Sequence, residues 1–173
     1  MWITQEIIYE IKPELIIETG TFESGSALYY SHLCDLMNNG KVITIDIEFR
    51  ERRPVHPRLR HILGSSTNTN VFNTIEYECK DAKPVLILLD SDHSRRHVLD
   101  EMNIYSNLVT VGSYLIVEDT ALNGHPIHPN EEQEGPMEAV EDFLKTNKNF
   151  VIDKSREKFL MTWHPNGFLK RIE

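Results

Sequence analysis

The sequence predicts an α/β fold, with a doubly wound, mostly parallel, Rossmann-like sheet and an antiparallel hairpin at its C-terminal edge. Short apolar runs alternate with segments of helical periodicity, which is typical of parallel sheets. Several runs are apolar throughout, as in strands buried on both faces. The last two runs have no helix between them, which favours antiparallel pairing. At 173 residues the chain fits one domain, residues 1–173.

Each predicted element follows from the spacing of its apolar residues and from the residues that end it. The first helix stops before Pro13, because a proline disfavours helical conformation in the preceding residue. The second stops at Asn38-Asn39-Gly40, a typical C-terminal cap. The helices are expected at residues 2–12, 24–38, 68–78, 93–108 and 137–145. The strands are expected at residues 15–17, 42–45, 59–63, 85–89, 114–117, 150–153 and 159–163.

Charge and hydropathy exclude several classes of partner. The chain has 18 basic and 27 acidic residues, a formal net charge of −9. Nucleic-acid backbones and anionic membranes need a basic face, so we expect neither as a partner. No apolar run approaches the roughly 18 residues that span a bilayer, and the first residues lack the pattern of a secretory signal. Cys34 and Cys79 lie too far apart for a metal motif, so we expect reduced thiols in a cytoplasmic protein.

Acidic residues follow two of the predicted strands. Asp90 and Asp92 come after residues 85–89, and Glu118 and Asp119 come after residues 114–117. Ligands gather at the carboxyl ends of strands in such sheets, and these two strands are expected to be neighbours. Crowded carboxylates raise each other's pKa unless a cation neutralises them. Asp92, Glu118 and Asp119 are therefore expected to bind a hard divalent cation, Mg²⁺ first; helix capping or exposure to water is the alternative.

A turn between the first strand and the second helix contains Gly20 and Gly25, in a position common for nucleotide binding. Their spacing matches the phosphate loop of NTPases, but Ser26 stands where that loop needs lysine. Phe22 holds the middle position of the dinucleotide fingerprint, where only glycine lets a pyrophosphate approach. S-adenosylmethionine carries a sulfonium and an amino acid in place of phosphates, so the acidic Glu18 suits it. A tight turn without a ligand is the remaining alternative.

Asp46 and the histidines refine this picture. Asp46 ends the second strand 26 residues after Gly20, where an acid can accept hydrogen bonds from both ribose hydroxyls. A solvated acid at a strand end is the alternative. His93 and His97 share a helix face, but no strand-borne carboxylate at a known spacing completes an iron site of two histidines and one carboxylate. We expect His93 to contact the cofactor or the substrate instead.

Five strings of the chain resemble the cephalosporin hydroxylase family, which includes rhamnosyl O-methyltransferases. They lie at residues 13–26, 42–47, 64–66, 88–98 and 112–120, and the similarity continues through the tail at residues 159–169. The resemblance implies a Rossmann-like fold of the S-adenosylmethionine-dependent methyltransferases and a Mg²⁺ site. It implies that Asp92, Glu118 and Asp119 are the metal ligands. The expected cofactor-binding residues are Glu18, Gly20, Thr21, Gly25, Ser26, Asp46, Ser65 and Asp90.

The layout is also similar to that of catechol-type O-methyltransferases, in which a lysine base follows the metal-binding aspartate by three residues. Arg95 holds that place here. Arginine stays protonated, with a pKa above about 12, so it is a poor base. His93 and Arg95 are the candidate catalytic residues. Either the metal alone acidifies the substrate hydroxyl, or His93 or a histidine of the loop at residues 120–134 takes the proton.

These expectations combine into a Mg²⁺-dependent O-methyltransferase that moves a methyl group from S-adenosylmethionine to a hydroxyl of a small molecule. A sugar or a polyketide is the expected acceptor by resemblance alone. The long loop at residues 120–134 would cover it. A non-catalytic cofactor-binding module of the same fold and an iron-dependent hydroxylase are the alternatives. Oligomeric state stays open, a homo-oligomer included.

Overall fold

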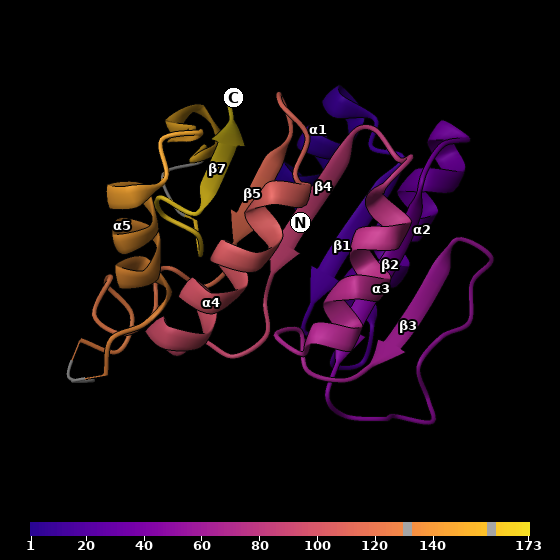
Figure 1. The fold of residues 1–173 in the computed structure, drawn as a ribbon, viewed down its shortest axis with the longest axis horizontal. Coiled ribbons are helices and arrows are strands. Elements are labelled where there is room, and N and C mark those ends of the chain that lie inside the picture. Colours follow the sequence, from indigo (N-terminus) through magenta and orange to yellow (C-terminus); the bar gives the residue numbers. More distant parts are fainter. Residues whose placement is uncertain (130–132, 159–161) are drawn as a thin grey trace.

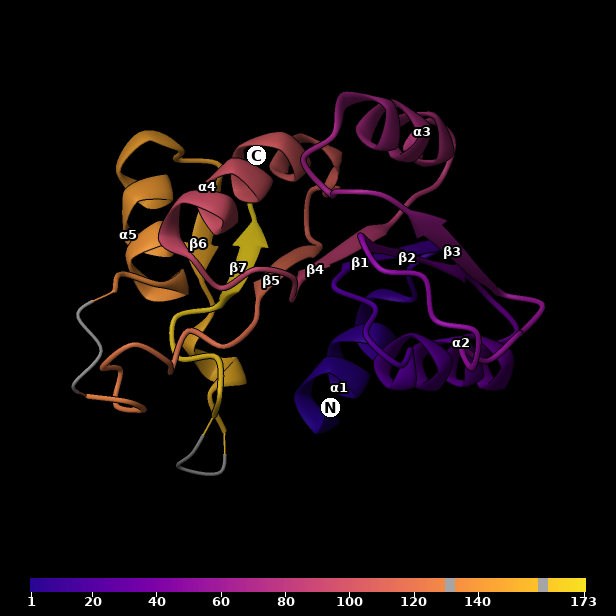
Figure 2. The same cartoon turned by 90° about the horizontal axis from the view of Figure 1, so that it is seen from below.

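The computed structural model describes residues 1–129, 133–158 and 162–173. A central sheet is covered by helices on both faces, as Figures 1 and 2 show. The helices are α1 (Trp2–Ile11), α2 (Gly25–Met37), α3 (Thr69–Cys79), α4 (Arg95–Tyr105), η1 (Ser106–Leu108), α5 (Pro136–Thr146) and η2 (Lys154–Arg156). The strands are β1 (Leu15–Thr19), β2 (Lys41–Asp46), β3 (Leu59–Leu63), β4 (Val85–Leu89), β5 (Tyr114–Val117), β6 (Phe150–Ile152) and β7 (Phe168–Arg171).

The sheet has the strand order β3-β2-β1-β4-β5-β7-β6. Strands β1 to β5 are parallel, and β7 runs antiparallel to both β5 and β6. The predicted fold class, including the antiparallel C-terminal edge, is confirmed. The order reverses between β1 and β4, because the chain adds β2 and β3 on one side before it returns to the other. In such sheets this switch point is where ligands bind.

The strands are buried because each side of the sheet packs on its own layer of helices. Helices α3, α4 and α5 cover one face, and α1 and α2 cover the other (Figure 2). Strand β4 is buried along its whole length, with Ile87 facing the first layer and Leu86 and Leu88 facing the second. This explains why its sequence is apolar throughout instead of alternating. No helix in the described part of the chain is long and apolar enough to cross a membrane.

One predicted strand lies mostly outside the described residues. We expected the last strand at residues 159–163, of which residues 159–161 lie outside the described part, and residues 162 and 163 are not in a strand. The strand that pairs with β5 and β6 is β7, which begins immediately after the turn at Pro165-Asn166-Gly167. Two of its four residues are basic, so its apolar run is too short to predict a strand.

Arg156 ties α1 to the C-terminal part of the chain. Its guanidinium donates to both carboxylate oxygens of Glu10, at 3.0 Å for the Oε1 contact, and Nη2 donates to the Tyr114 hydroxyl at 3.0 Å. Nε also lies 3.3 Å from Asp153 Oδ2. The Arg156 side chain is 10% exposed, so these bonds form largely out of water. A residue far along the sequence thereby holds the first helix against the sheet.

Arg156→Met is expected to lower the free energy of unfolding by about 2 kcal/mol, because it leaves partly buried acceptors without their donor. Urea denaturation followed by circular dichroism measures this change. The matched control is Lys154→Met, which removes an exposed ion pair with Glu157 and should change stability by no more than about 0.5 kcal/mol. Equal effects of the two substitutions would contradict the tethering role.

Candidate functional site

A cavity of about 630 Å³ opens at the carboxyl ends of β1, β2 and β4. It lies at the switch point of the sheet, where the predicted site residues were expected to meet. Six of the predicted residues line it: Gly20, Asp46, Ser65, Asp90, Asp92 and His93. The other predicted residues are not in its wall: Glu18, Thr21, Gly25, Ser26, Arg95, Glu118 and Asp119.

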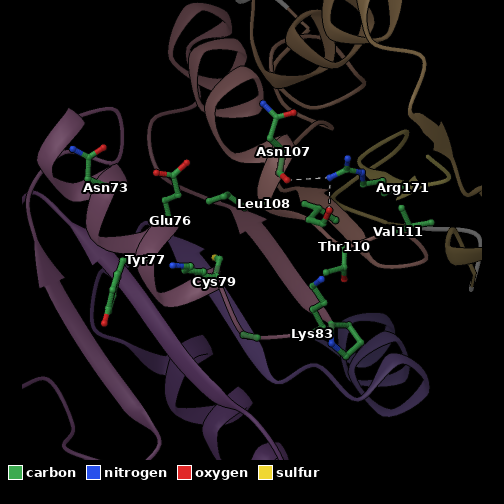
Figure 3. A pocket seen from close by; sticks show the side chains of 14 residues that line it. Asn73, Glu76, Tyr77, Cys79, Lys83, Asn107, Leu108, Thr110, Val111 and Arg171 are labelled. Carbon is green, nitrogen blue, oxygen red and sulfur yellow. Dashed lines mark hydrogen bonds between the residues drawn. The ribbon is translucent and has the colours of Figure 1, made fainter.

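A second cavity, of about 990 Å³, lies at the opposite ends of the strands (Figure 3). Its described wall contains one carboxylate, Glu76, and no histidine. Arg171 lies beside Asn107 and Thr110 in Figure 3, and its Nη1 donates to the backbone oxygens of Asn107 at 3.1 Å and of Val109 at 2.6 Å. These bonds satisfy backbone carbonyls at the end of η1, so Arg171 has a structural role there. We place the chemistry in the smaller cavity because convergent titratable groups occur there.

The turn after β1 depends on glycine at one of its two positions. Gly20 has φ +87°, and a Cβ atom added there would lie 1.8 Å from the backbone oxygen of Asp90. Only a residue without a side chain lets the ends of β1 and β4 approach this closely. Gly25, the first residue of α2, has open space within 4 Å. The two glycines of the motif therefore differ in their structural demands.

Glu18 is buried behind the cavity, at the end of β1. Thr44 Oγ1 donates to Glu18 Oε2 at 2.6 Å, and Thr21 Oγ1 lies 2.7 Å from the same Thr44 hydroxyl. Burial raises the pKa of Glu18 to about 7, against the opposing effect of the Ser26 and Thr44 hydroxyls. A cation bound beside this buried carboxyl group would stabilise its charged form and lower its pKa. The contact with Thr21 fixes the orientation of the Thr44 hydroxyl, which donates the hydrogen bond to Glu18.

Glu18→Gln is expected to stabilise the ligand-free protein at neutral and alkaline pH. The folded pKa of Glu18 is about 7 and its ordinary value is 4.5, so wild-type stability is fullest below the lower value and falls as pH rises through the higher one. Glutamine does not titrate, so the variant should gain on the order of 3 kcal/mol over wild type across this interval. Urea denaturation in chelator at a series of pH values measures the difference. Glu51→Gln, at an exposed loop position, is the control, and a pH-independent difference for Glu18→Gln would contradict the assignment.

Asp46 is held in place at the end of β2 by three donors. Phe22 N and Arg53 Nη2 each donate to Oδ2 at 2.8 Å, and Glu48 N donates to Oδ1 at 2.9 Å. Oδ1 therefore keeps capacity to accept a further bond from the cavity side. The guanidinium of Arg50 lies 4.5 Å from the centre of the Phe22 ring, which closes this end of the cavity with a cation–π contact.

Acidic groups crowd together where β4 and β5 end. His93 Nε2 lies 3.5 Å from Asp119 Oδ2 and 4.0 Å from Asp90 Oδ1. One ligand atom from each of these three residues lies within 4.8 Å of the others, which is compatible with a shared metal ion. Burial, with the nearby charges of Glu118 and Asp119, raises the pKa of Asp90 to about 8. Burial and the charge of Glu18 raise the pKa of Glu118 to about 7.

Asp92 and Arg95 lie differently from what was expected. Asp92 is exposed, and its Oδ1 accepts from Ser94 N at 2.7 Å, which stabilises the turn into α4. The aspartate whose carboxylate lies close to that of Asp119 is Asp90, the first residue after β4. Arg95 Nε donates to Asp142 Oδ2 at 2.9 Å, and the guanidinium also pairs with Glu134. Through the bond to Asp142, Arg95 links α4 to α5. The two carboxylates raise the pKa of Arg95 above its usual range, so its guanidinium stays protonated and cannot accept a proton.

His164 lies against the acidic cluster, and no pattern in the sequence predicts this position. Asp119 N donates to His164 Nδ1 at 2.9 Å, across 45 positions of the chain. Burial lowers the pKa of His164 to about 4, so the ring is neutral. Because Nδ1 accepts, the ring proton is on Nε2, which lies 3.8 Å from Glu118 Oε2. The neutral histidine thus accepts from the backbone of Asp119, and its other ring nitrogen lies near the Glu118 carboxylate, beyond hydrogen-bond distance. No local motif marks position 164.

The cavity and cluster can be compared with known proteins. The model of the family described as Rhamnosyl O-methyltransferase/CmcI matches residues 1–172. Rhamnosyl O-methyltransferases from Mycobacterium tuberculosis and Mycobacterium bovis are 39% identical to this chain over 181 residues, which is 99% of the chain and 72% of each relative. The Mycobacterium leprae enzyme of the same name is 38% identical over 180 residues, covering 99% of the chain and 77% of its own length.

Two solved structures share the fold at low sequence identity. A Mg–SAM structure of CmcI matches with a TM-score of 0.74 and 18% identity, over 99% of this chain and 70% of that one. The MycE methyltransferase from the mycinamycin biosynthetic pathway, in complex with Mg and SAH, matches with a TM-score of 0.66 and 14% identity, over 99% of this chain and 48% of that one. At these identities the likeness concerns the fold.

Proposed function

Because the chain belongs to the rhamnosyl O-methyltransferase/CmcI family, we propose that it transfers a methyl group from S-adenosylmethionine to a sugar hydroxyl, with Mg²⁺ as cofactor. The family resemblance found in the sequence is confirmed by this membership. The observation that carries the proposal is the cavity at the switch point, with the acidic cluster at its edge. On this proposal the cavity would hold the methyl donor and the adjoining cluster would activate the acceptor.

The residues around the cluster fit a hard divalent cation. Asp90, Glu118 and Asp119 offer carboxylate oxygens, which Mg²⁺ prefers as protein ligands. Burial and the repulsion of neighbouring carboxylates raise the pKa of Asp90 and of Glu118, and a bound cation would offset both effects. We assign the metal to Asp90, Asp119 and Glu118. Asp92 remains the ligand that the family resemblance implies, and the two assignments differ in their predicted mutational effects.

The cavity also fits the cofactor. Asp46 lines the cavity and would accept from ribose hydroxyls, and Ser65 lines the wall as well. Glu18, buried at the end of β1, would favour the ammonium group of S-adenosylmethionine. Gly20 permits the close turn that forms the floor.

The chain's own residues would position the acceptor and take up its proton. When bound, the metal would lower the pKa of the substrate hydroxyl. His93 lines the cavity 3.5 Å from Asp119, whose carboxylate would stabilise the imidazolium if His93 accepts that proton. Arg95 is excluded as a base by its pairing with α5. His125, a loop histidine considered for the same role, lies 2.6 Å from Glu138 Oε1.

Isothermal titration calorimetry with S-adenosylmethionine, with and without Mg²⁺, tests the proposal. We expect cofactor binding, and methyl transfer to a rhamnoside only when Mg²⁺ is present. No binding of the cofactor under either condition would overturn the proposal. Binding without turnover on any sugar or polyketide would identify a non-catalytic module. Bound iron together with consumption of 2-oxoglutarate would identify a hydroxylase.

A further inference from the structure

The end of the sheet opposite the proposed active site has an open face that the reaction does not use. Its larger part is the cavity of about 990 Å³ shown in Figure 3, which α3 and η1 help to line. A smaller hollow of about 390 Å³ adjoins it, and Tyr77, Lys80 and Ala82 line both. We call these two hollows together the basal face, which consists of residues 76–84 and 107–111 with Glu14, Lys41, Asn73 and Arg171.

The basal face carries an exposed aromatic ring next to an apolar hollow. The Tyr77 side chain lines both hollows and is 77% exposed, and Val111 in the larger one is 64% exposed. Leu108, Ala82 and Pro84 add further apolar surface to the larger hollow. In a two-fold symmetric pair of identical chains, the same patch of each copy must fit itself. A ring and a hollow on one patch meet this condition, because each copy can supply both to the other.

The charges of the basal face balance, although the chain as a whole is acidic. Its acidic residues are Glu14, Glu76, Glu78 and Asp81. Its basic residues are Lys41, Lys80, Lys83 and Arg171. The formal net charge of this face is therefore zero, so the net charge of −9 belongs to the rest of the chain. Two copies repel each other over most approaches, and the basal face is one along which that repulsion is small.

Four of these charges have no ion-pair partner within the described residues: Glu76, Lys80, Asp81 and Lys83. Glu78, by contrast, pairs with Lys41 at 2.5 Å and with Arg60 at 2.6 Å. Glu76 and Lys80 do not pair with each other, although they are four positions apart at the end of α3, a spacing at which such pairs form. Two acids and two lysines without partners are complementary to the same set on a second copy.

We propose that the basal face is the interface of a two-fold symmetric dimer of this chain, in which Tyr77 of each copy enters the larger hollow of the other. The unpaired Glu76 and Asp81 of one copy would lie against Lys80 and Lys83 of the second copy. The cavity at the switch point opens at the other end of the strands, so both copies would keep it accessible. The inference does not depend on the proposed function, because it concerns a different surface.

Sedimentation equilibrium of the full chain, at concentrations up to about 100 μM, measures the association, because this range populates complexes with micromolar Kd. Wild type should approach twice the chain mass of 20.1 kDa. Tyr77→Glu should raise the Kd of the dimer about thirtyfold or more, as expected when a central aromatic anchor is lost and a charge takes its place. Tyr9→Glu is the matched control, since Tyr9 is 68% exposed on α1 and lies outside the basal face, and its Kd should stay within about threefold of wild type.

Charge reversal tests whether the face is complementary to itself. One variant combines Lys80→Glu with Lys83→Glu and has an acidic basal face; the other combines Glu76→Lys with Asp81→Lys and has a basic one. Each variant alone should be a monomer, and an equimolar mixture should recover the mass of a dimer, because the two faces then attract.

All of these substitutions are at exposed positions, and thermal unfolding checks that each variant folds. A monomeric wild type over the whole concentration range would overturn the proposal. A dimer that Tyr77→Glu leaves intact, or that Tyr9→Glu disrupts equally, would show that another surface mediates the association. Failure of the two charge-reversed variants to associate with each other would also contradict it.

Discussion

Asp119→Asn is expected to lower kcat/KM for methyl transfer by about a hundredfold or more, because the metal would lose a charged ligand worth several kcal/mol in the transition state. Affinity for S-adenosylhomocysteine should stay within about threefold of wild type, since Asp119 lies outside the cavity wall. Asparagine is the substitution of choice because Asp119 has φ +57°, a conformation that asparagine tolerates. It also keeps the backbone donor to His164. Steady-state kinetics at saturating Mg²⁺ and calorimetry measure the two quantities.

Asp92→Asn provides the matched comparison at the other acid. Asp92 is exposed and accepts from Ser94 N, which asparagine can also do through its side-chain oxygen. We expect a loss of less than about tenfold, the size of an indirect effect. If Asp92→Asn is the more damaging substitution, the assignment of Asp90 in place of Asp92 is wrong, and the ligand set implied by the family resemblance is restored.

Gly20→Ala should lower the free energy of unfolding by about 3 kcal/mol or more. The new Cβ would lie 1.8 Å from the backbone oxygen of Asp90, so the ends of β1 and β4 must separate. The left-handed conformation at φ +87° adds about 1–2 kcal/mol for any residue with a side chain. Overpacking accounts for the rest. For a chain of this size the midpoint of thermal unfolding should fall by roughly 6–12 °C.

Gly25→Ala tests whether the effect belongs to the position or to glycine loss in general. A Cβ at Gly25 meets nothing within 4 Å, and the residue is already helical in α2. Alanine favours a helix by up to about 1 kcal/mol over glycine, so stability should stay level or rise. A similar destabilisation by both substitutions would show that the close contact between β1 and β4 is not what Gly20 provides.

The sequence predicts the parallel part of the sheet well, because its signal is local. Strand β4 lies at its predicted bounds, 85–89, since a run of apolar residues between polar ones is buried from both sides. The C-terminal edge is different. β7 has two apolar residues followed by two basic ones, so its place in the sheet comes from pairing with β5 and β6, which no local pattern records.

The candidate site likewise has residues that the sequence predicts and residues that it does not. The rule that ligands bind at strand ends locates Glu18, Asp46, Asp90 and Asp119 from their neighbours in sequence alone. It does not decide between Asp90 and Asp92, because that depends on how the chain turns after β4.

Long-range partners account for the remaining differences at the site. Arg95 bonds to Asp142 across 47 positions, and His164 to Asp119 across 45. Their roles are set by tertiary packing, which the spacing of residues does not report.

The insertion of β7 between β5 and β6 has a consequence for the order in which the protein forms during synthesis. β6 is made before β7, yet in the described sheet it pairs only with β7. A nascent chain that has completed α5 therefore still has an open edge at β5, and Glu118 and Asp119 lack His164. Because domains fold as their parts emerge from the ribosome, the acidic end of β5 would be the last region to mature.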